Sequence, residues 1–247
     1  MSYPHKPRVN GSTTGTLFFL LIFVFQFSKL SAQTETPDSL VKERINYIQD
    51  MLDQGKPVAK LWWDAWLYGY SAGTVVQSAV FISSDQLKTR QDMALGAATA
   101  LVGAVGQLIM PMTPAKAPGK LALLTGDSPE ERVLKLNKAE ELFEASAQRE
   151  KDGRSWQMHA ASSAINLGSG LITWLGFDRT IQSGLINFAI NEAITETQIW
   201  TQPTRAIKDH KSYCEKYNNG LPAALYKPKA HLYVNAFYGG LTLRLVF

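Results

Sequence analysis

The stretch Gly69–Gly73, Gly-Tyr-Ser-Ala-Gly, matches the pattern Gly-x-Ser-x-Gly, in which the serine can be the nucleophile of a hydrolase. Such a serine needs a strand before it and a helix after it, because the sharp turn between them exposes the hydroxyl. The preceding residues 61–68 carry neither the β-branched run of a buried strand nor a turn signal. We therefore interpret Ser71 as a small packing residue on a helix. The partners that a hydrolase would require are available downstream at His159, His210, His231, Asp178 and Asp209.

A second group of polar residues lies within long apolar segments and forms a candidate ligand site. Asn187 and Asn191 are four residues apart, so they share one face of a helix, and Glu192 is adjacent. If these residues converge, they form a buried polar site for a small ligand or ion. The alternative is that they hydrogen-bond to one another inside a bundle or face solvent. The full candidate set is Asp64, His159, Asn187, Asn191 and Glu192.

Composition limits the classes of protein that this chain could belong to. Its 247 residues, 45% apolar and 19% charged, predict one domain or two small ones with a real core. The net charge of +4 is scattered along the chain, which argues against nucleic acid as a partner. Cys214 is the only cysteine, so no internal disulfide can form. The sequence holds no metal-ligand spacing and no phosphate or dinucleotide loop, so we expect no metal and no cofactor.

Residues 1–32 have the features of a secretory signal. Lys6 and Arg8 precede the apolar run Thr16–Phe27, which is too short to span a membrane comfortably, and small residues follow it. We predict cleavage between Ala32 and Gln33, with an uncleaved anchor as the alternative. The mature protein is then expected in the periplasm or at the outer membrane.

The rest of the chain is predicted to be mainly α-helical. An amphipathic helix is expected within residues 33–60, and Gly55 and Pro57 are expected to end it. Two pairs of long apolar helices follow, and two such hairpins would pack as a four-helix bundle. The first hairpin covers residues 61–112, with helices Leu61–Ile82 and Met93–Met112, and the second covers 155–200, with helices Ser155–Phe177 and Thr180–Ile199.

The two hairpins are similar enough to indicate a duplication. An alignment that places Trp63 on Trp156 also places Asp85 on Asp178. The matches are sparse, so chance similarity is the alternative.

The segment between the hairpins, residues 113–154, is rich in charge and is expected to form a connecting arm or lid that is exposed to solvent. Within it, Ser128, Pro129 and Glu131 have the arrangement of a capping box with proline at the first helical position. Gly153 is expected to break this helix before the second hairpin begins.

The long helices are rich in Gly, Ala and Ser, which favours close packing between helices. Gly96, Ala100 and Gly103 fall on one strip of their helix, as in membrane helices that pack on small residues. Two observations argue against an ordinary inner-membrane bundle. Glu192 and Glu196 would be costly in hydrocarbon unless paired, and the basic residues gather in 113–154, on the side that an export signal places outside. We therefore expect an exported bundle that associates with a membrane through its first hairpin, with an inner-membrane protein as the alternative.

The C-terminal tail, residues 201–247, is expected to contain a β-hairpin around Gly239-Gly240. Leu241, Leu243 and Leu245 alternate with other residues up to the terminal Phe247. This alternation resembles the last strand of bacterial outer-membrane barrel proteins, which their assembly machinery recognises. The resemblance covers the end of the chain alone, because nothing upstream supplies the other strands of a barrel. The alternative is a strand pair that caps the helical core.

These observations lead to three hypotheses about function. The first is a non-enzymatic structural or interaction role at a membrane of the cell envelope, with membrane lipid or an envelope protein as partner and an oligomer as one form. The second is a small-ligand or ion binding or transport component that uses the polar set in the bundle. The third is a hydrolase built on Ser71.

Overall fold

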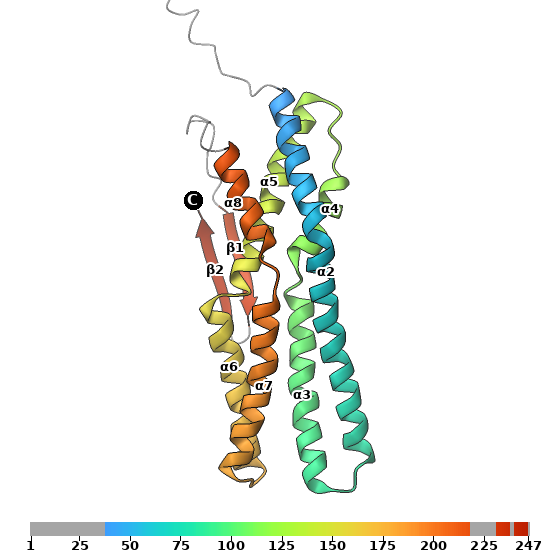
Figure 1. Ribbon diagram of the computed structural model, residues 1–247, viewed down its shortest axis with the longest axis vertical. Coiled ribbons are helices and arrows are strands. Elements are labelled where there is room, and N and C mark those ends of the chain that lie inside the picture. Colours follow the sequence, from blue (N-terminus) through green and yellow to red (C-terminus); the bar gives the residue numbers. More distant parts are fainter. Residues whose placement is uncertain (1–37, 218–230, 238–239, 247) are drawn as a thin grey trace, which may run out of the picture. The chain divides into compact units, whose positions relative to one another are not determined.

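The computed structural model describes residues 38–217, 231–237 and 240–246, so the proposed signal and its cleavage site lie outside the described residues. The chain divides into two compact units, residues 1–41 and 42–247. The described part is mainly α-helical, as predicted (Figure 1). Its elements are α2 (Asp38–Ser83), α3 (Leu87–Ile109), α4 (Thr113–Ala122), α5 (Pro129–Asp152), α6 (Trp156–Leu171), the π-helical turn η1 (Ile172–Gly176), α7 (Ile181–Thr201), α8 (Arg205–Tyr217), β1 (His231–Phe237) and β2 (Gly240–Val246).

Helix α2 continues through Gly55 and Pro57, so the prediction that the helix ends there was wrong. A proline inside a helix removes one backbone hydrogen bond and costs about 3 kcal/mol. The apolar face nevertheless continues on both sides of the proline, because Leu52 and Ala59 are both buried. Burial of this face on either side outweighs the local cost, and the predicted boundary between residues 60 and 61 falls inside one helix.

Two helical pairs form one end of this unit. Helices α2 and α3 run antiparallel, and so do α6 and α7 (Figure 1). A short connection after Ser83 joins α2 to α3, and η1 leads from α6 into the turn before α7. In that turn Asp178 has φ 52°, a left-handed conformation that Asp adopts more readily than most residues. We call the α2 segment from Trp62 onward together with α3, α6, η1 and α7 the paired helices.

The segment predicted to be an exposed arm is instead part of a second core, so that prediction was wrong. Helix α5 begins at the predicted capping box, where Ser128 Oγ accepts a hydrogen bond from the Glu131 amide at 3.1 Å, and it ends at Gly153. Helix α5 packs against α4 and α8, and its Glu140 pairs with Arg44 in the first part of α2. The buried residues of this core include Ile45, Ile48, Leu52, Leu121, Leu136, Ala139, Phe143, Ala147, Ala206 and Tyr213. We call this the charged end.

Strands β1 and β2 pair antiparallel, with Val234 opposite Leu243 and Phe237 opposite Gly240. The residues of the turn between them lie outside the described residues, as does the terminal Phe247 on which the resemblance to outer-membrane strands depends.

Candidate functional site

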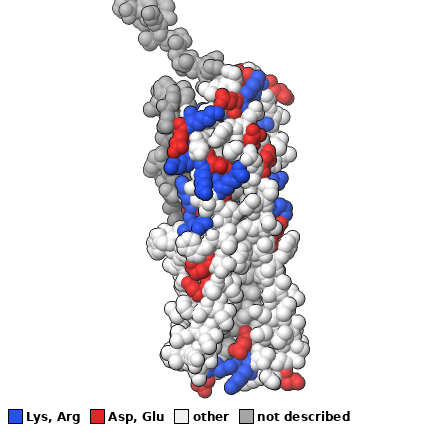
Figure 2. All heavy atoms as spheres, viewed as in Figure 1, with Lys and Arg blue, Asp and Glu red and all other residues white. Residues whose placement is uncertain are grey.

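The surface of the paired helices is unusually apolar. Figure 2 shows Lys, Arg, Asp and Glu over the charged end and again at the opposite tip, with few of them on the band between. Large apolar side chains on this band face outward from every helix. Soluble monomers rarely expose one large apolar patch, so such a surface marks contact with lipid or protein. The exposed residues include Val75, Ile82, Leu101, Leu108, Leu167, Leu175, Leu185 and Ile190.

The length of this band matches the hydrocarbon thickness of a bilayer. Helix α3 has 23 residues and α7 has 21, which at 1.5 Å per residue gives roughly 32–34 Å. The hydrocarbon core of a bilayer is about 30 Å thick. At the tip, the two connections between helices carry the charged residues Asp85, Asp178 and Arg179, and Lys88 lies in the first turn of α3.

Tryptophans gather where the band meets the charged end. The Trp62 indole donates a hydrogen bond to Thr201 Oγ1 at 3.2 Å, at the end of α7. The Trp63 indole donates to the Gln107 carbonyl at 2.9 Å, near the end of α3. At the same level, Trp156 begins α6 with 73% of its surface exposed, and Trp200 is 63% exposed. Exposed tryptophans at one level of a helical protein are typical of the boundary between lipid and water.

Four of the five predicted polar residues lie at the α6–α7 interface, and the fifth does not. His159 is on α6, and Asn187, Asn191 and Glu192 are on α7. Asp64 lies on α2, where it pairs with Lys60 one turn away and is not hydrogen-bonded to the other four.

These polar groups hydrogen-bond to one another. The Asn187 side-chain oxygen accepts from Ser169 at 2.7 Å and from Asn191 at 3.1 Å. The Asn166 amide donates to Glu192 and to Thr195, each at 2.8 Å. The set is therefore a network that joins α6 to α7, which is the alternative that the sequence left open.

A second carboxylate in the band is satisfied in the same way. His159 Nδ1 lies 2.7 Å from one oxygen of Glu196, and the Trp200 indole donates to the other oxygen at 2.9 Å. Both glutamates of α7 thus have partners within the protein. Internal pairing of this kind is what polar side chains need in hydrocarbon.

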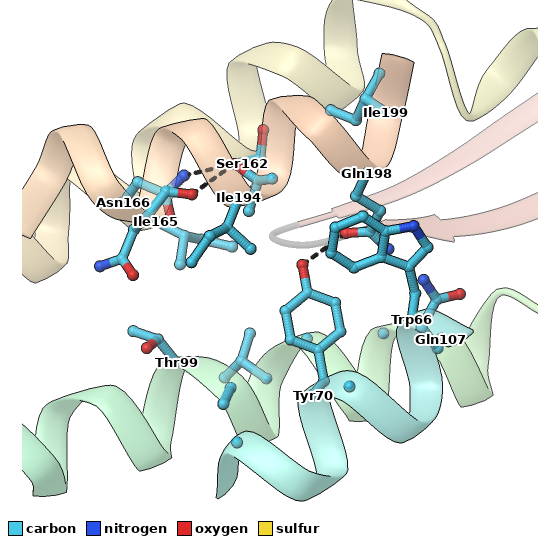
Figure 3. A pocket seen from close by; sticks show the side chains of 18 of the residues that line it. Trp66, Tyr70, Thr99, Gln107, Ser162, Ile165, Asn166, Ile194, Gln198 and Ile199 are labelled. Atoms are coloured by element: carbon cyan, nitrogen blue, oxygen red, sulfur yellow. Dashed lines mark hydrogen bonds between the residues drawn. The ribbon is translucent and has the colours of Figure 1, made fainter. Parts of the chain in front are cut away.

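A cavity of about 360 Å³ lies between the two helical pairs (Figure 3). Trp66 and Tyr70 of α2 face it from one side, and Ile165 and Ile194 face it from the other. The Tyr70 hydroxyl crosses the gap and donates to the Gln198 side-chain oxygen at 2.7 Å. The sequence does not indicate this cavity, because its walls come from helices that are far apart in the chain.

One charged side chain lines the cavity at the end nearest the charged core. Arg149, in the last turn of α5, donates to the Met110 carbonyl at 3.0 Å and to Gln202 Oε1 at 3.3 Å. Its Nε atom is buried and has no hydrogen-bond partner within the described part of the chain. Burial lowers the pKa of Arg149, but a guanidinium keeps its proton in proteins.

Ser71 lies in the middle of α2, as predicted, so it lacks the strand and turn that precede the serine of a hydrolase. Within residues 38–217 and the two strands, no group of three or more His, Cys, Asp or Glu side chains could hold a metal ion. No family model, curated protein or solved structure matches this chain.

Proposed function

We propose that the paired helices form a four-helix bundle embedded in a lipid bilayer, and that the protein has a non-enzymatic structural or interaction role at that membrane. The observation that carries this proposal is the apolar band on all of the paired helices, roughly 32–34 Å long at 1.5 Å per residue, bounded by tryptophans at one level and by charged connections at the other. The charged end would remain in water.

The polar network between α6 and α7 supports the proposal. A bundle in lipid must satisfy its polar groups internally, since hydrocarbon offers no partner. Glu192 and Glu196 meet this requirement through Asn166, His159 and Trp200. Their presence was one of the two objections to a membrane-spanning bundle, and their pairing within the protein answers that one; the other, the concentration of basic residues in 113–154, is unaffected by it.

Length and composition alone give weaker support. Among the described residues, one stretch, Leu87–Ala122, is long and apolar enough by itself to cross a membrane. A single stretch of this kind also occurs in soluble proteins. The proposal therefore rests on the apolar band that all of the paired helices have in common.

Our proposal for the location in the cell rests on the sequence. The signal features of residues 1–32 lead us to propose export to the cell envelope, with lipid or an envelope protein as partner. We also propose that the C-terminal strand pair contacts such a partner.

Cysteine labelling in vesicles tests whether the band lies in lipid. Leu167 on α6 and Leu134 on α5 are 51% and 68% exposed, so without a membrane their positions are similarly accessible. In a Cys214→Ser background, Leu167→Cys and Leu134→Cys would be reconstituted separately into phosphatidylcholine vesicles. A membrane-impermeant maleimide would be admitted to both faces by freeze–thaw.

We expect the cysteine at position 134 to react at least tenfold faster than the one at 167, because a thiol in hydrocarbon cannot ionise. The difference should disappear when each protein is unfolded in dodecyl sulfate. Equal rates in intact vesicles would contradict the proposal.

A second candidate function, binding of a small ligand inside the bundle, is favoured by the cavity between the helical pairs.

A further inference from the structure

We propose that the cavity binds a single-chain amphiphile with an anionic head group, a carboxylate or a phosphate, and that Arg149 binds this head group. The inference does not depend on insertion of the bundle into a bilayer, because it concerns the interior of the paired helices.

The charge of Arg149 is only partly compensated: Asp152 and Glu150 lie close enough to raise its pKa, but among the described residues no carboxylate accepts a hydrogen bond from it. Its hydrogen bonds go to neutral acceptors, the Met110 carbonyl and Gln202 Oε1, and its buried Nε donor is unused. Across the described residues, Arg149 forms no ion pair. The acidic residues nearest to it in sequence are engaged elsewhere, since Glu150 accepts from the Ile207 amide at 3.1 Å and Asp152 accepts from Gln148 at 2.6 Å. A buried cation without a directly hydrogen-bonded counter-ion is costly, and an anionic ligand would supply one.

The guanidinium is held in place before any ligand arrives. A Cβ atom built on Gly153 would lie 2.5 Å from Arg149 Nη1 and 2.1 Å from Gln202 Oε1. Because Gly153 has no side chain, the Arg149 guanidinium and the Gln202 amide can both pack against its backbone, in the short connection between α5 and α6. A planar guanidinium in a fixed position suits a carboxylate or phosphate, which it can bind through two parallel hydrogen bonds.

The body of the cavity suits a hydrocarbon chain. Along α2 its lining residues run from Trp62 to Gln77, about 22 Å at 1.5 Å per residue. Aromatic rings of Trp66 and Tyr70 form one wall, and isoleucines form the facing wall (Figure 3). Several polar groups along the walls are engaged with one another, as in the Tyr70–Gln198 bond, whereas Gln77 Oε1 is buried without a partner in the described part of the chain. A volume of about 360 Å³ is at the small end for ligand sites, which favours one chain over two.

Tryptophan fluorescence can detect such a ligand, because Trp62 and Trp66 line the cavity. The full chain in maltoside micelles would be titrated with 9,10-dibromostearate, whose bromines quench tryptophan at short range. The matched neutral probe is 9,10-dibromostearyl alcohol. We expect saturable quenching by the acid and an apparent affinity at least tenfold weaker for the alcohol. Equal affinities for the two probes would overturn the proposal.

Two further pairs of variants locate the head group and the chain. Arg149→Met should weaken binding of the acid about tenfold, the loss expected for a charged hydrogen bond, and leave the alcohol unchanged. Lys138→Met removes the same charge from an exposed position on α5 and should change neither. Trp66→Phe should reduce the quenched amplitude more than Trp174→Phe, because Trp174 does not line the cavity. The reverse order would place the probe on the outer surface and overturn the proposal.

Competition separates the two head groups. Displacement of the brominated acid by stearate alone assigns a carboxylate ligand, and displacement by lysophosphatidate alone assigns a phosphate ligand. Displacement by both assigns a site for either head group. Displacement by stearyl alcohol at the same concentration would overturn the proposal. If Arg149→Met does not fold, the acid and alcohol titrations of the unaltered protein and the Trp66–Trp174 comparison still decide the matter.

Discussion

Gly170 of α6 and Gly184 of α7 face each other where their helices cross, with no room for a side chain on either. A Cβ on Gly170 would lie 2.8 Å from the Gly184 carbonyl oxygen, and a Cβ on Gly184 would lie 2.7 Å from the Gly170 carbonyl oxygen. The obstacle on each side is backbone, which cannot turn away as a side chain can. The α6–α7 pair therefore depends on glycine at both positions, as closely packed membrane helices do.

Gly170→Ala should destabilise the protein. The two helices would have to separate locally, at a cost of about 1–3 kcal/mol for an overpacked contact. The gain in helix propensity is at most about 1 kcal/mol, so the net effect is a loss. Thermal unfolding in detergent micelles, followed by circular dichroism, would measure it.

Gly168→Ala is the matched control on the same helix, because nothing lies within 4 Å of a Cβ at that position. Gly168→Ala should gain up to about 1 kcal/mol of stability from the higher helix propensity of alanine, and its unfolding temperature should therefore rise. Equal shifts for the two variants would show that the helices do not meet at Gly170.

The paired helices could be predicted from sequence because each is a long apolar segment bounded by charged or turn residues. The strip of Gly96 and Gly103 also predicts that a neighbouring helix approaches closely there. The structure shows what approaches: the side chains of Gln77 and Tyr70 fill the space above these glycines. Periodicity within one helix cannot identify the residue that a neighbouring helix presents.

The charged end could not be predicted for a related reason. Half of the residues of α5 are charged, and so are nearly half of those of α8, the helix that packs on it. The buried residues of α8 are few, Ala206, Tyr213 and Tyr217, and tyrosine carries a polar hydroxyl. The composition of neither helix therefore predicts a buried core. The cavity was missed because Arg149 and Tyr70, which line it, lie far apart in the chain.

Tyr213→Phe should lower the stability of the charged end. The Tyr213 hydroxyl accepts a hydrogen bond from Arg44 Nε at 2.8 Å and donates one to Glu140. Its loss leaves a buried guanidinium donor unpaired, which costs about 1–3 kcal/mol. Chemical denaturation would measure the change.

Tyr217→Phe is the control for that measurement. The Tyr217 hydroxyl donates to Glu43 at 2.8 Å, and the Glu43 carboxylate is exposed, so water can replace the bond. We expect a loss below about 1 kcal/mol. A larger loss for Tyr217→Phe than for Tyr213→Phe would contradict the assignment of Tyr213 to the buried network.

Gly103→Ala should disturb the α2–α3 contact and the cavity together. The new methyl group would lie 2.7 Å from ring carbons of Tyr70, so the ring must turn and the Tyr70–Gln198 bond must break. We expect a loss of about 1–3 kcal/mol and a change in the near-ultraviolet circular dichroism of the aromatic residues.

Gly73→Ala provides the comparison from the opposite helix. Its methyl group would meet the Ala100 methyl at 3.7 Å, an ordinary contact. The aromatic spectrum should therefore stay as it is. If both variants leave the spectrum unchanged, the Tyr70 ring does not lie over Gly103.

Glu150 makes the stability of the charged end depend on pH. Burial raises the pKa of its carboxyl from 4.5 to about 7, even though the Ile207 amide at the start of α8 donates to it. Nearby Asp209 raises this pKa further, and Arg149 lowers it. Between pH 4.5 and 7 the folded protein therefore binds a proton that the unfolded chain has lost, and stability falls as the pH rises. The full shift corresponds to about 3 kcal/mol.

Glu150→Gln should remove this dependence, because the amide cannot titrate yet still offers an oxygen to Ile207. His210, whose pKa is lowered by burial, acts in the opposite direction below pH 6.5 and is present in both proteins. The informative quantity is thus the difference in unfolding free energy between the two proteins at pH 5 and at pH 8. We expect the unaltered protein to lose stability relative to the variant over that interval. A difference that is constant with pH would mean that Glu150 is already ionised at pH 5 in the folded protein.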